Sequence, residues 1–113
     1  MPIFITQGRY TQAALTGMMQ SHENRAKPVA ELYEAAGGKL LAFYITFGEY
    51  DWLSIGELPD HRADLAVLIA GASKGAVSDL KTTIAVTPEE FALACTDAAA
   101  LAPGFKGAGF PAG

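Results

Sequence analysis

The sequence contains a single cysteine, Cys95, among its 113 residues. One cysteine cannot form a disulfide within the chain, and it cannot build a cysteine-rich zinc or iron–sulfur site. The pair His22 and Glu23 does not have the spacing of metal ligands either. We therefore expect neither a metal nor a cofactor.

Basic residues are few, and long apolar runs are absent. Eight Lys and Arg residues are scattered against twelve Asp and Glu, which gives a net charge of -4. Binding to nucleic acid requires clustered positive charge, and a membrane span requires about 20 consecutive apolar residues. The first six residues also lack the basic and apolar regions of a signal peptide. We expect a cytoplasmic protein with no nucleic-acid or membrane partner.

Hydrophobic residues, by contrast, make up half of the chain, and only 18% of it is charged. This composition is typical of a folded domain rather than of a disordered chain. Glycine and proline concentrate at the C-terminal end. We expect one domain over residues 1–102 and a Gly/Pro-rich tail over residues 103–113. Phe105 and Phe110 of that tail could reach across to another subunit.

Residues 42–57 form two apolar, β-branched and aromatic runs joined by a short polar turn, which predicts a β-hairpin. Around it the patterns predict further strands and helices. The expected elements are a strand over Ile3 to Gly8, helical pieces over Gln12 to Met19 and about Arg25 to Ala36, hairpin strands over Leu40 to Phe47 and Trp52 to Leu58, a helix after Asp60, a strand over Val77 to Val86 and a helix after Thr87.

Three of these helices carry apolar residues at helical spacing, the last of them at Phe91, Ala94, Cys95, Ala98 and Leu101, and three have recognisable caps. The first stripe is Val29, Leu32, Tyr33 and Ala36, and the second is Leu65, Leu68, Ile69 and Ala72. Thr11, Asp60 and Thr87 are suited to cap the helices that follow them.

The order of elements favours an α+β, ferredoxin-like βαββαβ fold with a C-terminal helix. In this fold both main helices cover one face of a four-stranded antiparallel sheet. We expect the other, open face to carry Tyr44, Thr46, Trp52 and Ser54. Leaving such a face in water costs about 25 cal/mol per Å² of apolar surface. A homodimer with the two sheets face to face, or a higher homo-oligomer, is therefore expected.

The hairpin turn, Gly48-Glu49-Tyr50-Asp51, contains a Gly-x-Tyr-Asp pattern, and the chain resembles the GYD-domain family from Ile3 to about Leu93. Further matching segments are Gly8-Arg9-Tyr10-Thr11, Gly37-Gly38-Lys39-Leu40, Phe43-Tyr44-x-x-Phe47-Gly48, Glu57-x-Pro59-Asp60 and Thr87-Pro88-Glu89-Glu90. The resemblance implies a dimeric α/β barrel but no particular activity. Relatives at the level of the fold include cofactor-free monooxygenases, haem-degrading enzymes and small-molecule binding or stress proteins.

Three residues are candidates for catalysis. Tyr50 and Asp51 could orient a polar ligand or move a proton at a pocket mouth, or they could simply stabilise the turn. His22 could act as a base or a haem ligand over the cavity, or it could be a solvated loop histidine.

Five residues are candidates for ligand binding. Arg9 and Tyr10 follow the first strand and could bind an anion or a carbonyl, or form a surface ion pair and a packing ring. Tyr44, Trp52 and Ser54 would give the open sheet face an aromatic wall with hydroxyl groups. The same residues could instead form the core of a dimer interface.

These observations predict a small-molecule binding or regulatory protein that acts as a dimeric α/β barrel. The alternative is a cofactor-independent enzyme, similar to a monooxygenase or an isomerase, that acts on a small aromatic or carbonyl compound. A barrel that serves only for assembly is a third interpretation.

Overall fold

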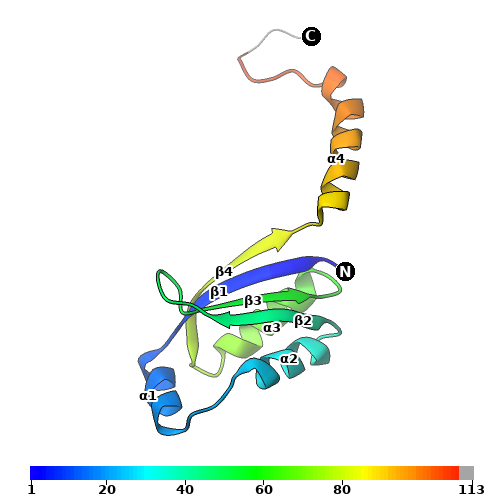
Figure 1. Cartoon of the computed structure of the whole chain (residues 1–113). Coiled ribbons are helices and arrows are strands. Elements are labelled where there is room, and N and C mark those ends of the chain that lie inside the picture. Colours follow the sequence, from blue (N-terminus) through cyan, green and yellow to red (C-terminus); the bar gives the residue numbers. More distant parts are fainter. Residues whose placement is uncertain (110–113) are drawn as a thin grey trace.

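The structure is a computed structural model that describes residues 1–109 (Figure 1). The elements in order are β1 (Ile3–Tyr10), α1 (Gln12–Gln20), α2 (Ala26–Ala35), β2 (Lys39–Ile45), β3 (Trp52–Glu57), α3 (His61–Ala72), β4 (Val77–Ala85), α4 (Pro88–Leu101) and the short 3₁₀ helix η1 (Ala102–Gly104). Phe110 and the rest of the predicted tail beyond residue 109 lie outside the described residues.

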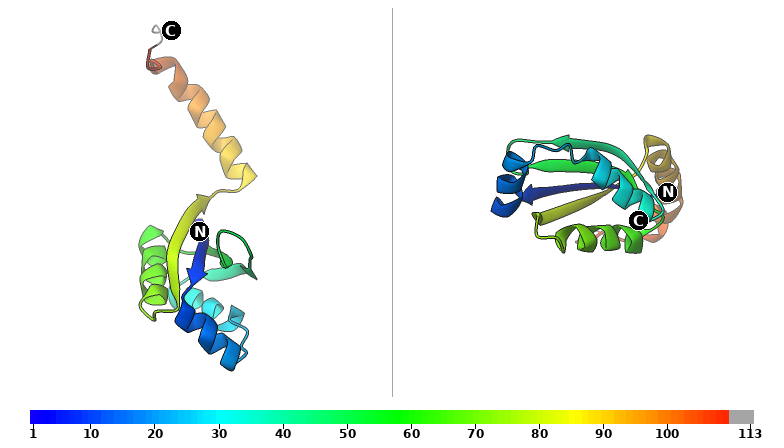
Figure 2. Two further views of the ribbon diagram at one scale, coloured as in Figure 1. Left: turned by 90° about the vertical axis from the view of Figure 1, so that its left-hand side faces the viewer. Right: turned by 90° about the horizontal axis from the view of Figure 1, so that it is seen from below.

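The four strands form one antiparallel sheet in the order β2-β3-β1-β4. Helices α2 and α3 lie against one face of this sheet (Figure 2). A core cluster of Phe4, Tyr33, Leu58 and Val67 joins β1, α2 and α3. The predicted α+β, ferredoxin-like βαββαβ fold with an additional C-terminal helix is confirmed.

Local sequence signals explain where the helices begin. The hydroxyl oxygen of Thr11 accepts a hydrogen bond from the Ala14 amide at 3.2 Å, and the Asp60 carboxylate accepts one from Ala63 at 2.8 Å. Thr87 caps α4 in the same way. Each cap satisfies an amide that the first helical turn leaves without a partner. None of the helices within residues 1–109 is long and apolar enough to cross a bilayer.

The covered face of the sheet combines large residues such as Phe4 and Trp52 with small ones. Thr6 lies opposite Ser54, and Phe4 lies opposite Gly56, in the β1–β3 register. A Cβ at Gly56 would collide with the ring of Tyr33 from α2. The absence of a side chain at Gly56 therefore lets α2 approach the sheet closely.

The prediction that Trp52 and Ser54 lie on the open face is wrong. Both are on the covered face, with only 8% and 2% of their surfaces exposed. The tyrosine hydroxyl of Tyr33 lies 3.1 Å from Ser54 Oγ, so the helix supplies the partner that this buried hydroxyl requires. Thr46 lies just beyond β2, where its hydroxyl donates to the Tyr50 carbonyl. Of the four, only Tyr44 lies within the open face, and 62% of it is exposed.

The open face carries larger branched residues. Ile5 lies opposite Ile55, and Tyr44 lies opposite Leu53. The register shifts between Leu40 and Ala42, which marks a β-bulge in β2. The three isoleucine and leucine side chains named here are half-buried in the single chain.

Helix α3 turns a different side to the sheet than its predicted stripe. Leu65 and Ile69 are exposed, whereas Asp64 and Val67 are buried. Because α3 is apolar around most of its circumference, periodicity alone could not decide which side faces the sheet.

Helix α4 stands apart from the rest of the molecule. It continues beyond the end of β4 and projects away from the sheet (Figures 1 and 2). Every residue of α4 is open to solvent. The elongated envelope of 64 × 30 × 21 Å follows from this projection.

Candidate functional site

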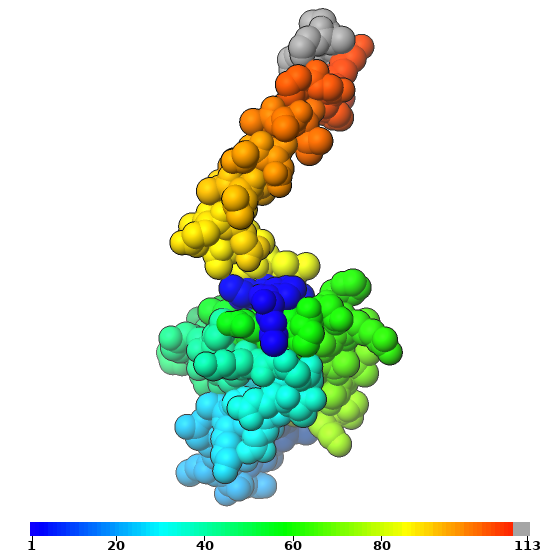
Figure 3. Space-filling model, turned by 90° about the vertical axis from the view of Figure 1, so that its right-hand side faces the viewer, coloured from blue at the N-terminus to red at the C-terminus, as the bar shows by residue number. Residues whose placement is uncertain are grey.

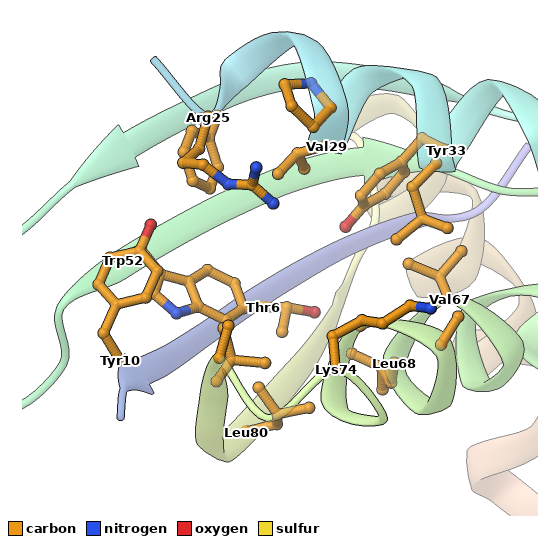
Figure 4. Close-up of a pocket in the computed structure, with 17 residues that line it drawn as sticks. Thr6, Tyr10, Arg25, Val29, Tyr33, Trp52, Val67, Leu68, Lys74 and Leu80 are labelled. Atoms are coloured by element: carbon orange, nitrogen blue, oxygen red, sulfur yellow. The ribbon is translucent and has the colours of Figure 1, made fainter. Parts of the chain in front are cut away.

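A cavity of about 330 Å³ lies between the covered face of the sheet and helices α2 and α3 (Figure 4). This volume is at the small end of the range for ligand sites in proteins. Most of the wall is apolar. The main apolar side chains that line it are Val29, Leu32, Phe43, Trp52, Val67, Leu68 and Leu80.

Two cations border the same cavity. Figure 4 shows the Arg25 guanidinium pointing between α2 and the sheet, with Tyr10 nearby, while Lys74 extends along the opposite wall beside α3. Glu23 lies 3.4 Å from Arg25 in an exposed ion pair. Because guanidinium has five N–H donors, Arg25 can contact Glu23 and still offer donors to a ligand. Lys74 is exposed, and no ion pair is found for it within residues 1–109.

Tyr10 provides a neutral hydroxyl at this end of the cavity. Burial raises the pKa of the Tyr10 phenol, the positive charge of Arg25 opposes that increase, and the carboxylates of Asp51 and Glu23 add to it. The phenol is therefore protonated at neutral pH and can donate a hydrogen bond.

The inner wall is fixed by hydroxyl pairs. Thr6 Oγ1 lies 2.9 Å from Thr82 Oγ1 across β1 and β4, and Tyr33 bonds Ser54 across α2 and β3. Burial raises the pKa of Tyr33, the hydrogen bond with Ser54 lowers it in part, and Asp64 raises it. These groups already satisfy one another, so they shape the cavity more than they offer free contacts.

Trp52 forms a large flat part of the wall. Its indole packs so closely on Gly8 that a Cβ there would collide with it, and its ring centroid is 6.3 Å from that of Phe43. The indole Nε1 is buried and has no hydrogen-bond partner among residues 1–109. The Trp52 ring thus gives the cavity an aromatic surface.

The Gly-x-Tyr-Asp turn clamps the hairpin to the end of β1. Asp51 Oδ2 accepts a hydrogen bond from the Tyr10 amide at 2.9 Å, and the Asp51 amide donates to the Gly8 carbonyl at 2.9 Å. Arg9 Nε donates to the Glu49 carbonyl, and its guanidinium lies 5.5 Å from the centre of the Tyr50 ring. These contacts are those of a turn-stabilising motif.

Of the residues predicted for the site, Tyr10 and Trp52 line the cavity and Ser54 supports it. Asp51 borders a neighbouring hollow of about 600 Å³ that shares Tyr10, Arg25 and Phe43 with the cavity. Arg9 and Tyr50 are occupied in the clamp.

His22 and Tyr44 lie elsewhere. His22 is exposed in the loop between α1 and α2, with Nε2 2.8 Å from the Met19 carbonyl oxygen. Tyr44 is on the opposite face of the sheet. Neither is among the described residues that line the cavity.

The sequence reasoning missed Arg25, Lys74 and Tyr33 as site residues. Tyr33 offered a usable signal, because a tyrosine in an otherwise apolar helix stripe must find a hydrogen-bond partner in the sheet. Arg25 and Lys74 are distant in sequence and meet only through the fold. No group of three or more potential metal-binding side chains is found within residues 1–109.

Solved structures with a similar fold show low identity to this chain. The crystal structure of FFRP-DM1 is 18% identical with a TM-score of 0.47, and the match covers 76% of this chain and 100% of that one. The hypothetical protein PHS023 from Pyrococcus horikoshii is 18% identical with a TM-score of 0.48, covering 77% and 92%. The protein TTHA0845 from Thermus thermophilus is 16% identical with a TM-score of 0.42, covering 77% and 95%.

No curated protein shows significant similarity to the chain. The model of the GYD domain, however, matches residues 4–94. This match spans the sheet, the cavity, the clamp and the first half of α4. The chain therefore belongs to the GYD domain family.

Proposed function

We propose that the protein binds a small organic molecule with an apolar, flat body and an anionic head. The observation that carries this proposal is the cavity itself, which combines an apolar and aromatic wall with Arg25 and Lys74. The apolar wall, including Trp52 and Phe43, favours a ring or a short hydrocarbon body. The two cations and the Tyr10 hydroxyl favour a carboxylate or a similar anion.

Arg25 and Lys74 stand out as cations beside one cavity because the chain as a whole is negatively charged. A protein with a net charge of -4 repels anions over most of its surface. Two cations on opposite walls of one apolar cavity then make the cavity a place where an anionic group is attracted. Glu23 beside Arg25 limits this attraction, so the cavity is suited to a single negative charge rather than to a phosphate.

The alternative function, a cofactor-independent enzyme, relied on His22 and on the Tyr50–Asp51 pair. The His22 ring contacts a backbone carbonyl in an exposed loop, and Asp51 holds the Tyr10 amide. No specific observation in residues 1–109 favours catalysis by these groups, so binding is the function that we propose.

The protein is also proposed to act as a homodimer in which the open sheet faces meet. Ile5, Leu53 and Ile55 are supported on that face by the strand register, and a single chain leaves them half-exposed. Their burial against a second copy would stabilise the dimer by about 25 cal/mol per Å² of apolar surface.

Trp52 is the only tryptophan of the chain, so its fluorescence reports directly on the cavity. Phenylacetate is expected to change the Trp52 emission with a saturable titration curve. Its uncharged analogue phenylacetamide should bind about tenfold more weakly, because it lacks the charge that Arg25 and Lys74 attract. The variants Arg25→Gln and Lys74→Gln should each reduce the preference for the acid.

Lys106→Gln is the matched control, because it removes one positive charge from the exposed segment after η1. It should leave the titration unchanged. If neither compound produced a saturable change in emission, the cavity would not be a site for this class of ligand. Equal affinities for the acid and the amide would refute the anionic head.

A further inference from the structure

Within residues 1–109, nothing covers the apolar side of α4. Phe91 and Leu101 are exposed, and every residue of α4 is open to solvent. Figure 3 shows the helix standing clear of the body, beyond the end of the sheet. An isolated helix of 14 residues is only marginally stable in water, even with a good N-terminal cap. This helix therefore needs a partner.

The spacing of its apolar residues indicates what kind of partner fits. Phe91, Ala94, Ala98 and Leu101 are separated by three, four and three residues. This is the a/d spacing of a seam between two helices, and we call these four residues the α4 seam. Alanine at its two central positions lets another helix approach closely. Such a seam is self-complementary, so a second copy of α4 can fill it.

The charges of α4 favour a parallel pair. Phe91 and Ala98 are at the a positions of the seam. Glu90 and Asp97 directly precede them and therefore occupy position g. In a parallel pair, these carboxylates would lie beside Cys95 and Ala102 of the other helix, which are uncharged. In an antiparallel pair with the seam residues aligned, Asp97 would lie near Asp97 of the other helix and would repel it.

A homodimer whose two-fold axis runs parallel to the strands brings the two α4 helices to the same end. A two-fold axis parallel to the strands stacks the open faces and keeps both β4 strands pointing in one direction. Both α4 helices then leave the same end of the barrel, where only Val86 and Thr87 separate each helix from β4. Joining the helices to one dimer also raises their effective concentration, which offsets the shortness of the seam.

We propose that α4 pairs with α4 of a second copy, in parallel, along the seam of Phe91, Ala94, Ala98 and Leu101. This inference rests on the proposed homodimer and is independent of the ligand cavity. The family match ends at residue 94, so Ala98 and Leu101, half of the seam, belong to the part of the chain beyond it.

Cysteine cross-linking tests the pairing and its direction. Cys95→Ser first removes the natural thiol, and Ala98→Cys then places one thiol on the seam. Residues at equivalent a positions of a parallel pair are close enough for a disulfide, so mild oxidation should give a covalent dimer rapidly. Thr96→Cys, on the opposite side of the helix, is the matched control and should cross-link at least about tenfold more slowly.

A second measurement keeps the natural cysteine and adds a charge to the seam. Sedimentation equilibrium of Ala98→Asp should show a dimer dissociation constant about tenfold higher than that of the wild type. Thr96→Asp adds the same charge outside the seam and should have no such effect. Because both positions are exposed in the single chain, neither change should unfold the body.

Each outcome decides for or against the pairing of the two α4 helices. Rapid and selective cross-linking at position 98 supports the parallel pair. Slow or equal cross-linking at positions 96 and 98 in a protein that sediments as a dimer refutes the pairing but leaves the sheet-to-sheet dimer intact. A monomer refutes both forms of assembly, whereas an unchanged Trp52 titration in that monomer would show that the ligand proposal stands separately.

Discussion

The two faces of the sheet are built differently, because the covered face mixes large residues such as Phe4 and Trp52 with small ones, whereas the open face carries branched residues. The face beneath α2 and α3 carries Thr6, Ser54 and Gly56, whereas the open face carries Ile5, Leu53 and Ile55. On polarity alone the first set belongs in water and the second in the core. The observed arrangement is the reverse, because small residues make room for the rings of Tyr33 and Trp52.

This difference shows that small residues of the covered face leave room for a large side chain from a helix. Tyr33 reaches down from α2, and its hydroxyl satisfies Ser54. The open face lacks such a layer in the single chain, so its branched side chains are available to another surface. The residues of the covered face therefore stabilise the fold of the single chain, whereas the branched residues of the open face can contact another surface.

The largest expected difference between the faces is seen at the neighbouring residues Phe4 and Ile5. Phe4→Ala should lower the free energy of unfolding by about 3–4 kcal/mol, because it empties the centre of the core cluster. Ile5→Ala should cost only about 1 kcal/mol in dilute protein, because this side chain is half-exposed. Urea unfolding at two protein concentrations measures both values.

For Ile5→Ala, the loss should increase at the higher protein concentration, where the wild type gains stability from the dimer. An equal loss of stability for the two variants at low concentration would contradict the distinction between the faces.

A second comparison concerns the room beneath α2. Gly56→Ala should destabilise the protein by about 2 kcal/mol, because the new methyl group would collide with the Tyr33 ring. Gly17→Ala is the matched control, since nothing lies within 4 Å of its added Cβ and alanine favours the helix α1. Thermal or urea unfolding should therefore shift in opposite directions for the two variants. A neutral Gly56→Ala would show that α2 can move away from the sheet without cost.

The smallest effect involves a polar group on the covered side. Burial raises the pKa of Asp64 on α3 above its ordinary value, and Tyr33 is the titratable group that interacts with it. The unfolded chain then releases this proton at lower pH than the folded chain. Stability conferred by the protonated group falls as the pH rises from about 4 through the folded pKa, and is constant above it.

The free energy of unfolding of Asp64→Asn, taken relative to that of the wild type, should accordingly be higher at pH 7 than at pH 4. Asp97→Asn changes an exposed residue of α4. Its free energy of unfolding should differ from that of the wild type by the same amount at both pH values. Urea unfolding of the three proteins at each pH provides the measurement. A pH-independent effect of Asp64→Asn would mean that this carboxyl titrates as it does in water.

Local features of the fold could be predicted from sequence because their causes are local. Thr11, Asp60 and Thr87 each cap a helix through an amide three residues away. The alternation of Leu53 and Ile55 with Trp52 and Ser54 was also visible in the sequence. Which of the two sets would be covered was not, because that depends on the fit between Gly56 and Tyr33.

The site shows the same limit over longer distances. Tyr10 could be identified because it follows the first predicted strand. Trp52 could be predicted for its aromatic ring, but on the open face, whereas the cavity lies on the covered face. Arg25 and Lys74 carry no motif, and only the packing of α2 and α3 on the same face brings them to one cavity. The bulge in β2 similarly changes the face of Leu40 relative to the strict alternation that a sequence pattern assumes.

The central place of β1 has a consequence for how the chain folds. This strand comes first in the sequence, yet its two neighbours in the sheet, β3 and β4, follow much later. During synthesis, β1 cannot pair on both of its edges until the chain has been made up to about Ala85. Until then, the hydrogen bond from the Tyr10 amide to Asp51 can help to pair only the edge of β1 that faces β3. Such long-range closure predicts slower folding than local pairing would give, with one edge of β1 left exposed until β4 has emerged.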